Sequence, residues 1–160
     1  MIIYELVGGK WTSRIGDLAS HGSMERFQPK AFHRYALVMP TGELLARCII
    51  ACWEANAVAI PIDPRLPRAT IAAMIEHADP HEVVDSLATV LREVKLGLSP
   101  EGDFAIIYTS GSTSAPKGVV LTRKAVALDA RRVADWHEWR NGVSTGTVMG
   151  LHHVNAFSGS

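Results

Sequence analysis

The residues best suited to chemistry in this sequence lie between two apolar segments, in a stretch rich in small hydroxyl side chains. The stretch contains Gly111 and ends at Lys117 and Gly118, and its hydroxyl residues are Thr109, Ser110, Ser112, Thr113 and Ser114. Small hydroxyl residues beside glycine let the backbone turn tightly and direct several N–H and O–H groups toward one point, which suits the acceptor oxygens of a polyphosphate. A lysine at the end supplies positive charge where a departing phosphate gathers negative charge. The stretch 109–118 is therefore predicted to be a phosphate-binding loop.

The order of these residues decides between this interpretation and two others. The Walker pattern needs glycine, four residues and then Gly-Lys-Ser/Thr at the start of a helix. Here Pro116 precedes Lys117, and Gly118-Val-Val is predicted to continue as a strand, so a kinase or GTPase of that class is not expected. Composition alone would favour a flexible surface loop, but the order of the residues reverses this preference.

The elements that must position this loop alternate between strands and helices. The predicted strands are short apolar runs at 35–39, 57–62, 82–85 and 103–109, and the predicted helices cover 43–55, 69–78, 86–94 and 123–139. Each strand is apolar on both faces, which is typical of a parallel sheet covered on both sides. The sequence therefore predicts an α/β fold over 36–160, with a mostly parallel sheet and helices on both faces.

Local signals refine these elements. Thr41 is expected to cap the helix that follows it with its hydroxyl, and Pro67 suits the start of the helix at 69–78. The first 35 residues are rich in glycine and are predicted to be an irregular lead-in with one short helix at 15–20.

Composition and charge exclude several classes of function. The chain has 160 residues, 48% of them hydrophobic and 20% charged, which indicates one ordinary globular domain. Sixteen basic residues balance sixteen acidic ones, so no net field favours a nucleic acid. No secretory leader or membrane span is apparent. Cys48 and Cys52 are predicted to be two reduced thiols rather than metal ligands, which favours a cytoplasmic location.

Other candidate residues are assigned structural roles. Pro80 breaks the helix that would align His77 with His81, so both are expected at an exposed helix end. Trp136 and Trp139 are expected to pack against the protein rather than against a nucleobase.

Thr-Ser-Gly-Ser-Thr followed by Pro-Lys-Gly-Val closely resembles the phosphate loop of the adenylate-forming, AMP-binding superfamily. This superfamily contains the acyl-CoA synthetases, the adenylation domains of nonribosomal peptide synthetases, and the luciferases. Ser114 is a departure, because the family usually has glycine there and a side chain restricts the backbone. Residues 49–64 resemble the family's helix-to-strand stretch with its Pro-x-Asp-Pro turn. Residues 151–156 are similar to a motif whose histidine borders the acyl pocket.

The resemblance implies an activity and a set of site residues. In the family, a carboxylate attacks the α-phosphate of Mg·ATP, and the resulting acyl-adenylate is transferred to the thiol of coenzyme A or of a carrier-protein pantetheine. Carried onto this chain, Lys117 is the catalytic residue, Gly118 keeps the turn tight, and His153, which precedes the apolar Val154, lines the substrate pocket. The residues expected to hold the phosphates of ATP are Thr109, Ser110, Gly111, Ser112, Thr113 and Lys117. Mg²⁺ is expected with the nucleotide, and no protein ligand for a metal is assigned.

Three functions remain open on the sequence. An acyl-CoA synthetase-like activity on a small carboxylic acid is favoured, because no acidic residue that would hold a substrate amine follows His153. The first alternative is an amino-acid-activating adenylation domain of a nonribosomal peptide synthetase, with a carrier protein as partner. The second is a non-catalytic phosphate- or nucleotide-binding module. Relatives are longer and carry an adenine-contacting motif and a C-terminal catalytic lysine, so the chain is expected to be an N-terminal fragment that is inactive alone.

Overall fold

The computed structural model describes residues 3–7, 10–14, 27–85, 90–93, 100–109, 116–140, 144–145 and 149–154. Its helices are α1 (Glu43–Glu54), α2 (Arg68–Ala78) and α3 (Arg123–Trp136). Its strands are β1 (Ile3–Val7), β2 (Lys10–Arg14), β3 (Arg34–Val38), β4 (Val58–Ile62), β5 (Glu82–Val84), β6 (Val90–Glu93), β7 (Asp103–Thr109), β8 (Lys117–Thr122) and β9 (Ser144–Thr145).

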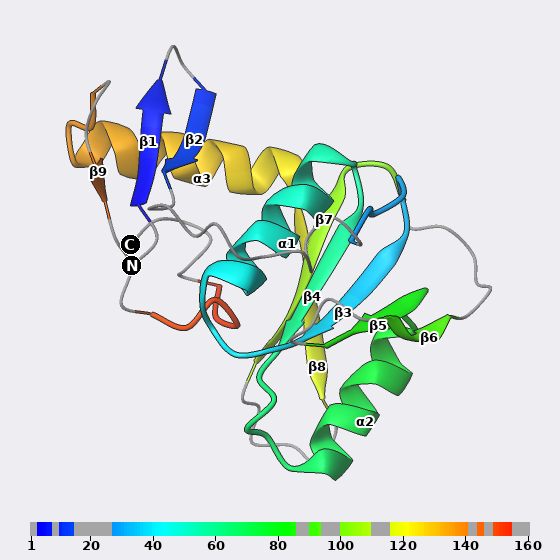
Figure 1. Cartoon of the computed structure of the whole chain (residues 1–160). Helices are drawn as coiled ribbons and strands as arrows, with labels where there is room; N and C mark the ends of the chain where they lie inside the picture. Colours follow the sequence, from blue (N-terminus) through cyan, green and yellow to red (C-terminus); the bar gives the residue numbers. More distant parts are fainter. Residues whose placement is uncertain are drawn as a thin grey trace.

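The main sheet has the strand order β6-β5-β3-β4-β7-β8, and its four inner strands are parallel (Figure 1). Parallel neighbours need a crossover connection, and α1 provides it between β3 and β4. Helix α2 connects β4 to β5, which pairs with the other edge of β3. The outer strands β6 and β8 pair antiparallel with β5 and β7. The predicted α/β fold with a mostly parallel sheet is confirmed.

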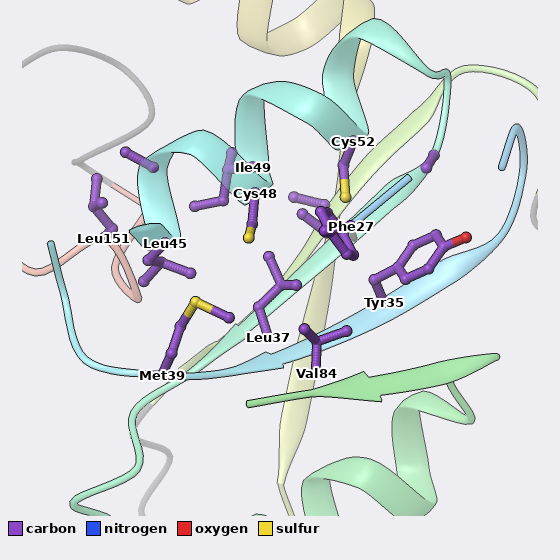
Figure 2. Close-up of a cluster of buried hydrophobic side chains, with 14 of the residues drawn as sticks. Phe27, Tyr35, Leu37, Met39, Leu45, Cys48, Ile49, Cys52, Val84 and Leu151 are labelled. Atoms are coloured by element: carbon purple, nitrogen blue, oxygen red, sulfur yellow. The ribbon is translucent and has the colours of Figure 1, made fainter. Parts of the chain in front are cut away.

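Helices α1 and α2 cover opposite faces of this sheet, as the sequence predicts. Alternate residues of β3 point to the two sides, because successive side chains of a strand face opposite ways. Tyr35 and Leu37 pack with α1, whereas Ala36 packs with α2. On the α1 side, the buried helix residues are Leu45, Ala46, Cys48, Ile49 and Cys52 (Figure 2). On the α2 side, Met74 and Ala78 are buried.

The start of α1 differs from the prediction. Gly42, not Thr41, is the N-cap residue, and no side chain caps the helix. The Thr41 hydroxyl instead contacts Leu151 and His152, more than a hundred residues further along the chain. Thr41 therefore makes long-range contacts in place of the helix cap that the sequence suggested.

Two further expectations are wrong. The irregular lead-in contains the antiparallel strands β1 and β2, with Val7 paired to Lys10. The glycines at 8 and 9 between two short runs are the signal that was missed, because Gly-Gly is typical of a tight hairpin. The helix expected at 86–94 contains strand β6, which pairs with the otherwise open edge of β5. The short helix expected at 15–20 lies outside the described residues.

Helix α3 is confirmed, but it buries none of its side chains. Strand β8 beside it is also largely exposed. Trp136, expected to pack, is 83% exposed, and Trp139 stacks on His137 with ring centres 5.5 Å apart. No helix within the described ranges is long and apolar enough to cross a membrane.

Candidate functional site

Three segments with polar side chains come together at one edge of the sheet. Strands β3, β4 and β7 are parallel neighbours, so their carboxyl ends reach the same edge. Thr41 follows β3, Asp63 follows β4, and Thr109 ends β7. Ligands of open α/β sheets bind outside the carboxyl ends of the strands. This edge is therefore the candidate site.

The predicted phosphate loop joins β7 to β8 at this edge. The two strands form an antiparallel hairpin in which Thr109 is paired with Lys117. Both side chains are exposed. Thr109, Lys117 and Gly118 are therefore fixed by strand pairing. The other predicted phosphate-binding residues lie outside the described residues, and they are Ser110, Gly111, Ser112 and Thr113; Ser114 lies there as well.

Gly118 has a steric role that the sequence did not specify. It lies within β8 opposite Tyr108, rather than in a turn. A Cβ atom on Gly118 would lie 2.8 Å from Cγ2 of Ile106 and 3.4 Å from the Tyr108 ring. A contact below 3.0 Å forces atoms to move, so a side chain at position 118 would displace either the Ile106 side chain or β8 itself.

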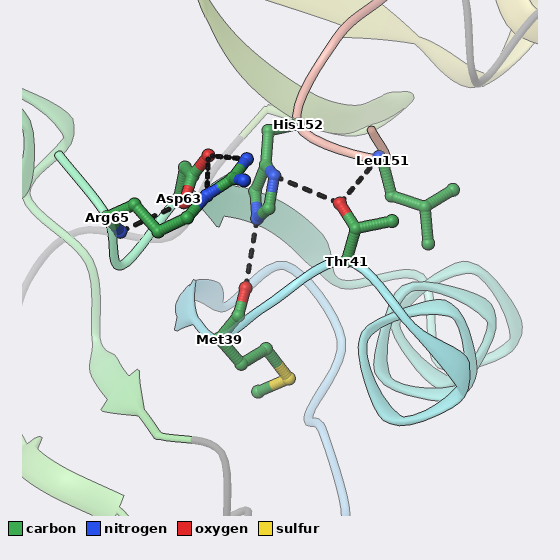
Figure 3. Close-up of polar contacts among 6 residues, drawn as sticks. All are labelled: Met39, Thr41, Asp63, Arg65, Leu151 and His152. Carbon is green, nitrogen blue, oxygen red and sulfur yellow. Dashed lines mark hydrogen bonds and ion pairs between the residues drawn. The ribbon is translucent and has the colours of Figure 1, made fainter. Parts of the chain in front are cut away.

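His152, the neighbour of the predicted pocket residue, is held by hydrogen bonds at the same edge (Figure 3). Its Nε2–H donates to the Met39 carbonyl oxygen over 2.9 Å, and its Nδ1 lies 3.2 Å from the Thr41 hydroxyl. That hydroxyl also accepts the Leu151 N–H over 3.1 Å. With Nε2 as donor to a carbonyl, Nδ1 of a neutral ring accepts from Thr41. Burial lowers the pKa of His152, which favours this neutral form.

His153 itself is exposed, whereas Leu151 and His152 are buried. Residues 149–154 form a turn rather than a strand, and the two neighbouring histidines differ in exposure within it. The sequence offered little to single out His152, because its partners Met39 and Thr41 lie about 110 residues away.

Asp63 and Arg65 form an ion pair beside His152 (Figure 3). The Asp63 carboxylate accepts the Arg65 backbone N–H over 2.9 Å and its guanidinium over 2.8 Å. The first of these bonds is an Asx-type turn, which explains the aspartate in the Pro-Ile-Asp-Pro segment. Hydrogen bonding from Arg65 lowers the pKa of Asp63 to about 2. Asp63 is therefore an anion at neutral pH.

The two thiols and His81 are buried in other parts of the fold. Cys48 and Cys52 are buried in the α1 cluster, where burial raises the pKa of Cys48 to about 12 and raises that of Cys52 as well. His81, expected to be exposed, is buried and stacks on His33 with ring centres 4.3 Å apart. Its Nδ1 accepts the backbone N–H of Arg34, so a backbone partner draws it into the sheet. The described part of the chain holds no group of three or more His, Cys, Asp or Glu that would suit a metal ion.

Comparison with known proteins relates the chain to large synthetases. It is 33% identical over 102 residues to CymA of Salinispora arenicola, named as a nonribosomal peptide synthetase, and covers 1% of that protein with 58% of its own length. It is 30% identical over 119 residues to a dimodular nonribosomal peptide synthase of Bacillus subtilis, covering 5% of it with 58% of the chain. The chain thus spans a small part of the relatives that it matches. No protein-family profile matches it.

Solved structures with the same fold include both acyl-activating and peptide-forming enzymes. The N-terminal domain of FACL13 from Mycobacterium tuberculosis superimposes with a TM-score of 0.61 and 22% identity, over 81% of this chain and 41% of that one. O-succinylbenzoate coenzyme A synthetase from Bacillus subtilis, in complex with AMP, superimposes with a TM-score of 0.61 and 15% identity, over 85% of this chain and 42% of that one. A four-domain nonribosomal peptide synthetase bound to AMP and glycine superimposes with a TM-score of 0.54 and 21% identity, over 69% of this chain and 10% of that one.

These structural likenesses establish the fold, and the sequence matches add common ancestry over more than half of the chain. The chain is therefore similar in sequence to a small part of nonribosomal peptide synthetases and shares the fold of these solved structures, which supports the predicted resemblance to the adenylate-forming, AMP-binding superfamily.

Proposed function

We propose that residues 1–160 supply the phosphate-binding part of an enzyme that activates a carboxylic acid with ATP as an acyl-adenylate and transfers the acyl group to a thiol. The observation that carries this proposal is the Thr109–Lys117 pair at the carboxyl edge of the sheet. It fixes the backbone of two residues, one with a hydroxyl and one with an ammonium group, at the two ends of the Ser/Thr/Gly-rich segment. This arrangement suits the terminal phosphates of ATP.

The proposed chemistry asks little of the protein beyond positioning and charge. Attack of a carboxylate on the α-phosphorus of ATP breaks the bond to the β-phosphate, and the departing pyrophosphate gains negative charge. Lys117 is exposed at the base of the loop and would neutralise part of that charge. Mg²⁺, bound with the nucleotide, would supply further neutralisation.

The carboxylate substrate is proposed to lie near residues 149–154. His153 remains the proposed pocket residue, since its side chain is exposed beside the buried His152. The His152–Thr41 and His152–Met39 bonds would hold this segment in place. Such a supporting shell keeps a pocket wall at a fixed distance from the reacting groups.

Two acyl acceptors are supported by different observations. The sequence relatives are nonribosomal peptide synthetases, which favours an amino acid as substrate and the pantetheine of a carrier protein as acceptor. The fold is also shared with a coenzyme A synthetase, which favours coenzyme A as the acceptor. The absence of an acidic residue directly after His153 in the sequence supports an acid without an amine.

The experiment is acid-dependent exchange of radioactive pyrophosphate into ATP, measured with the polypeptide that carries this chain and the rest of the domain. Fatty, aryl and amino acids are compared as substrates. Exchange with one class supports the adenylation proposal and names the substrate. Binding of ATP or pyrophosphate without exchange for any acid would favour the non-catalytic phosphate-binding module instead.

A further inference from the structure

Helix α2 is tethered to the end of β7 that carries the predicted phosphate loop. Tyr108, the residue before Thr109, donates its hydroxyl proton to the Met74 carbonyl oxygen over 2.9 Å. The same hydroxyl oxygen lies 2.9 Å from Nδ1 of His77, and the two rings meet edge to face with centres 5.8 Å apart. Met74 and His77 lie one turn apart on α2, so both contacts come from one face of the helix.

The direction of the second hydrogen bond follows from the first. A tyrosine hydroxyl has a single proton, and here the Met74 carbonyl accepts it. Nδ1–H of His77 must therefore donate to the Tyr108 oxygen. Burial raises the pKa of Tyr108 to about 12, so the phenol keeps its proton at neutral pH. The hydroxyl is committed to holding the strand and is not available for proton transfer.

This tether acts on the same pair of strands that carries Thr109 and Lys117. Tyr108 pairs with Gly118 across the hairpin, one step from the Thr109–Lys117 pair. The Tyr108 ring also lies within 3.4 Å of the position that a Cβ of Gly118 would occupy. A displacement of the Tyr108 side chain would therefore be passed directly to the backbone that precedes Thr109 and follows Lys117.

We propose that Tyr108 and His77 are positioning residues for ATP: the α2 tether holds the Thr109–Lys117 end of the hairpin where it meets the phosphates. This inference rests on the proposed function. His77 belongs to α2, outside the segments that suggested the family, and neither residue was predicted to take part in the site.

Removal of the Nδ1–H donor by His77→Ala should raise the KM for ATP by about fivefold or more, because small displacements of positioning groups are costly. The KM for the carboxylic acid should change by less than about twofold, since the tether lies at the phosphate end. Tyr108→Phe should have the same effect. His77→Asn should restore ATP use, because the asparagine amide places an N–H near the position of Nδ1. Glu76→Ala, an exposed neighbour on α2, is the matched control.

Equal changes in both KM values, or loss of ATP affinity that His77→Asn does not rescue, would overturn the positioning role. Failure of the proposed function is recognised separately, as absence of exchange in the unaltered protein with every acid. In that case the tether is tested by the backbone amide resonances of Thr109 and Lys117. His77→Ala should shift them and His77→Asn should not, and unmoved resonances would contradict the tether itself.

Discussion

The guanidinium of Arg123 lies 4.9 Å from the centre of the Trp53 ring and donates a hydrogen bond to the Trp53 carbonyl oxygen over 2.6 Å. It also donates to the carbonyl oxygens of Ala57 and Cys52, over 3.0 and 3.3 Å. The Cys52 and Trp53 carbonyls belong to the last turn of α1, and that of Ala57 directly precedes β4. Arg123 begins α3, so one side chain ties the end of the β7–β8 hairpin to α1.

Replacement of Arg123 should destabilise the fold more than replacement of an exposed arginine. Arg123→Ala removes three hydrogen bonds and the cation–π contacts with Trp53 and Phe104, and we expect a loss of about 2–4 kcal/mol in the free energy of unfolding. Arg123→Lys should recover only part of this, because lysine lacks the forked donors. Urea unfolding measures the change, with Arg131→Ala on the exposed side of α3 as control. Equal stability of the two alanine variants would contradict the clamp.

Any side chain at position 118 is expected to lower the stability of the protein. Gly118→Ala places a Cβ 2.8 Å from Cγ2 of Ile106, and we expect a cost of about 1–3 kcal/mol. Ile106→Leu removes the branch that carries Cγ2, so the double variant should regain part of the loss. Thermal unfolding of the single and double variants checks this coupling. Strictly additive effects would show that the clash is not the cause.

The His152 network predicts a stability that falls as the pH is lowered. The pKa of His152 is below the ordinary value of 6.5, chiefly because of burial. The unfolded chain therefore binds the proton more readily, and the contribution of His152 is complete above pH 6.5 and declines as the pH falls below it. Gln in place of His152 keeps an N–H donor for Met39 but cannot titrate.

The measurement is the free energy of unfolding at about pH 7.5 and about pH 5.5, a range in which histidine is the side chain that ordinarily titrates. The unaltered chain should lose more stability over this range than the His152→Gln variant. The other six of the seven histidines are the same in both proteins, so the difference between the two proteins reports on His152. A wild-type dependence no steeper than that of the variant would refute the assignment of a neutral, buried imidazole.

The sequence predicts the inner sheet because those strands are fully apolar and the helices between them have clear periodicity. Strand β4, with every residue buried, and helix α1, with its buried residues at helical spacing, are examples. The sequence does not predict strand β6 at the margin of the sheet, because the residues of β6 have no pattern that distinguishes a strand from a helix. There, pairing with the exposed edge of β5 outweighs local preference.

The candidate site shows the same division between local and long-range information. The hairpin of Thr109 and Lys117 follows from contiguous residues, so the motif predicts it. The contacts of Thr41 with His152 and of Tyr108 with His77 join residues 111 and 31 positions apart. No spacing rule connects such positions, because the topology of the sheet alone brings them together.

The most direct test of the central claim compares Lys117→Ala with Lys124→Ala in acid-dependent pyrophosphate exchange, using the polypeptide that carries this chain and the rest of the domain. Lys117 ends the loop at its pairing with Thr109, whereas Lys124 is exposed on α3. The account predicts that Lys117→Ala lowers kcat/KM for ATP by about a hundredfold and leaves the KM for the acid nearly unchanged. Lys124→Ala should behave as the unaltered protein. Unchanged ATP kinetics in Lys117→Ala would contradict the assignment of the phosphate site.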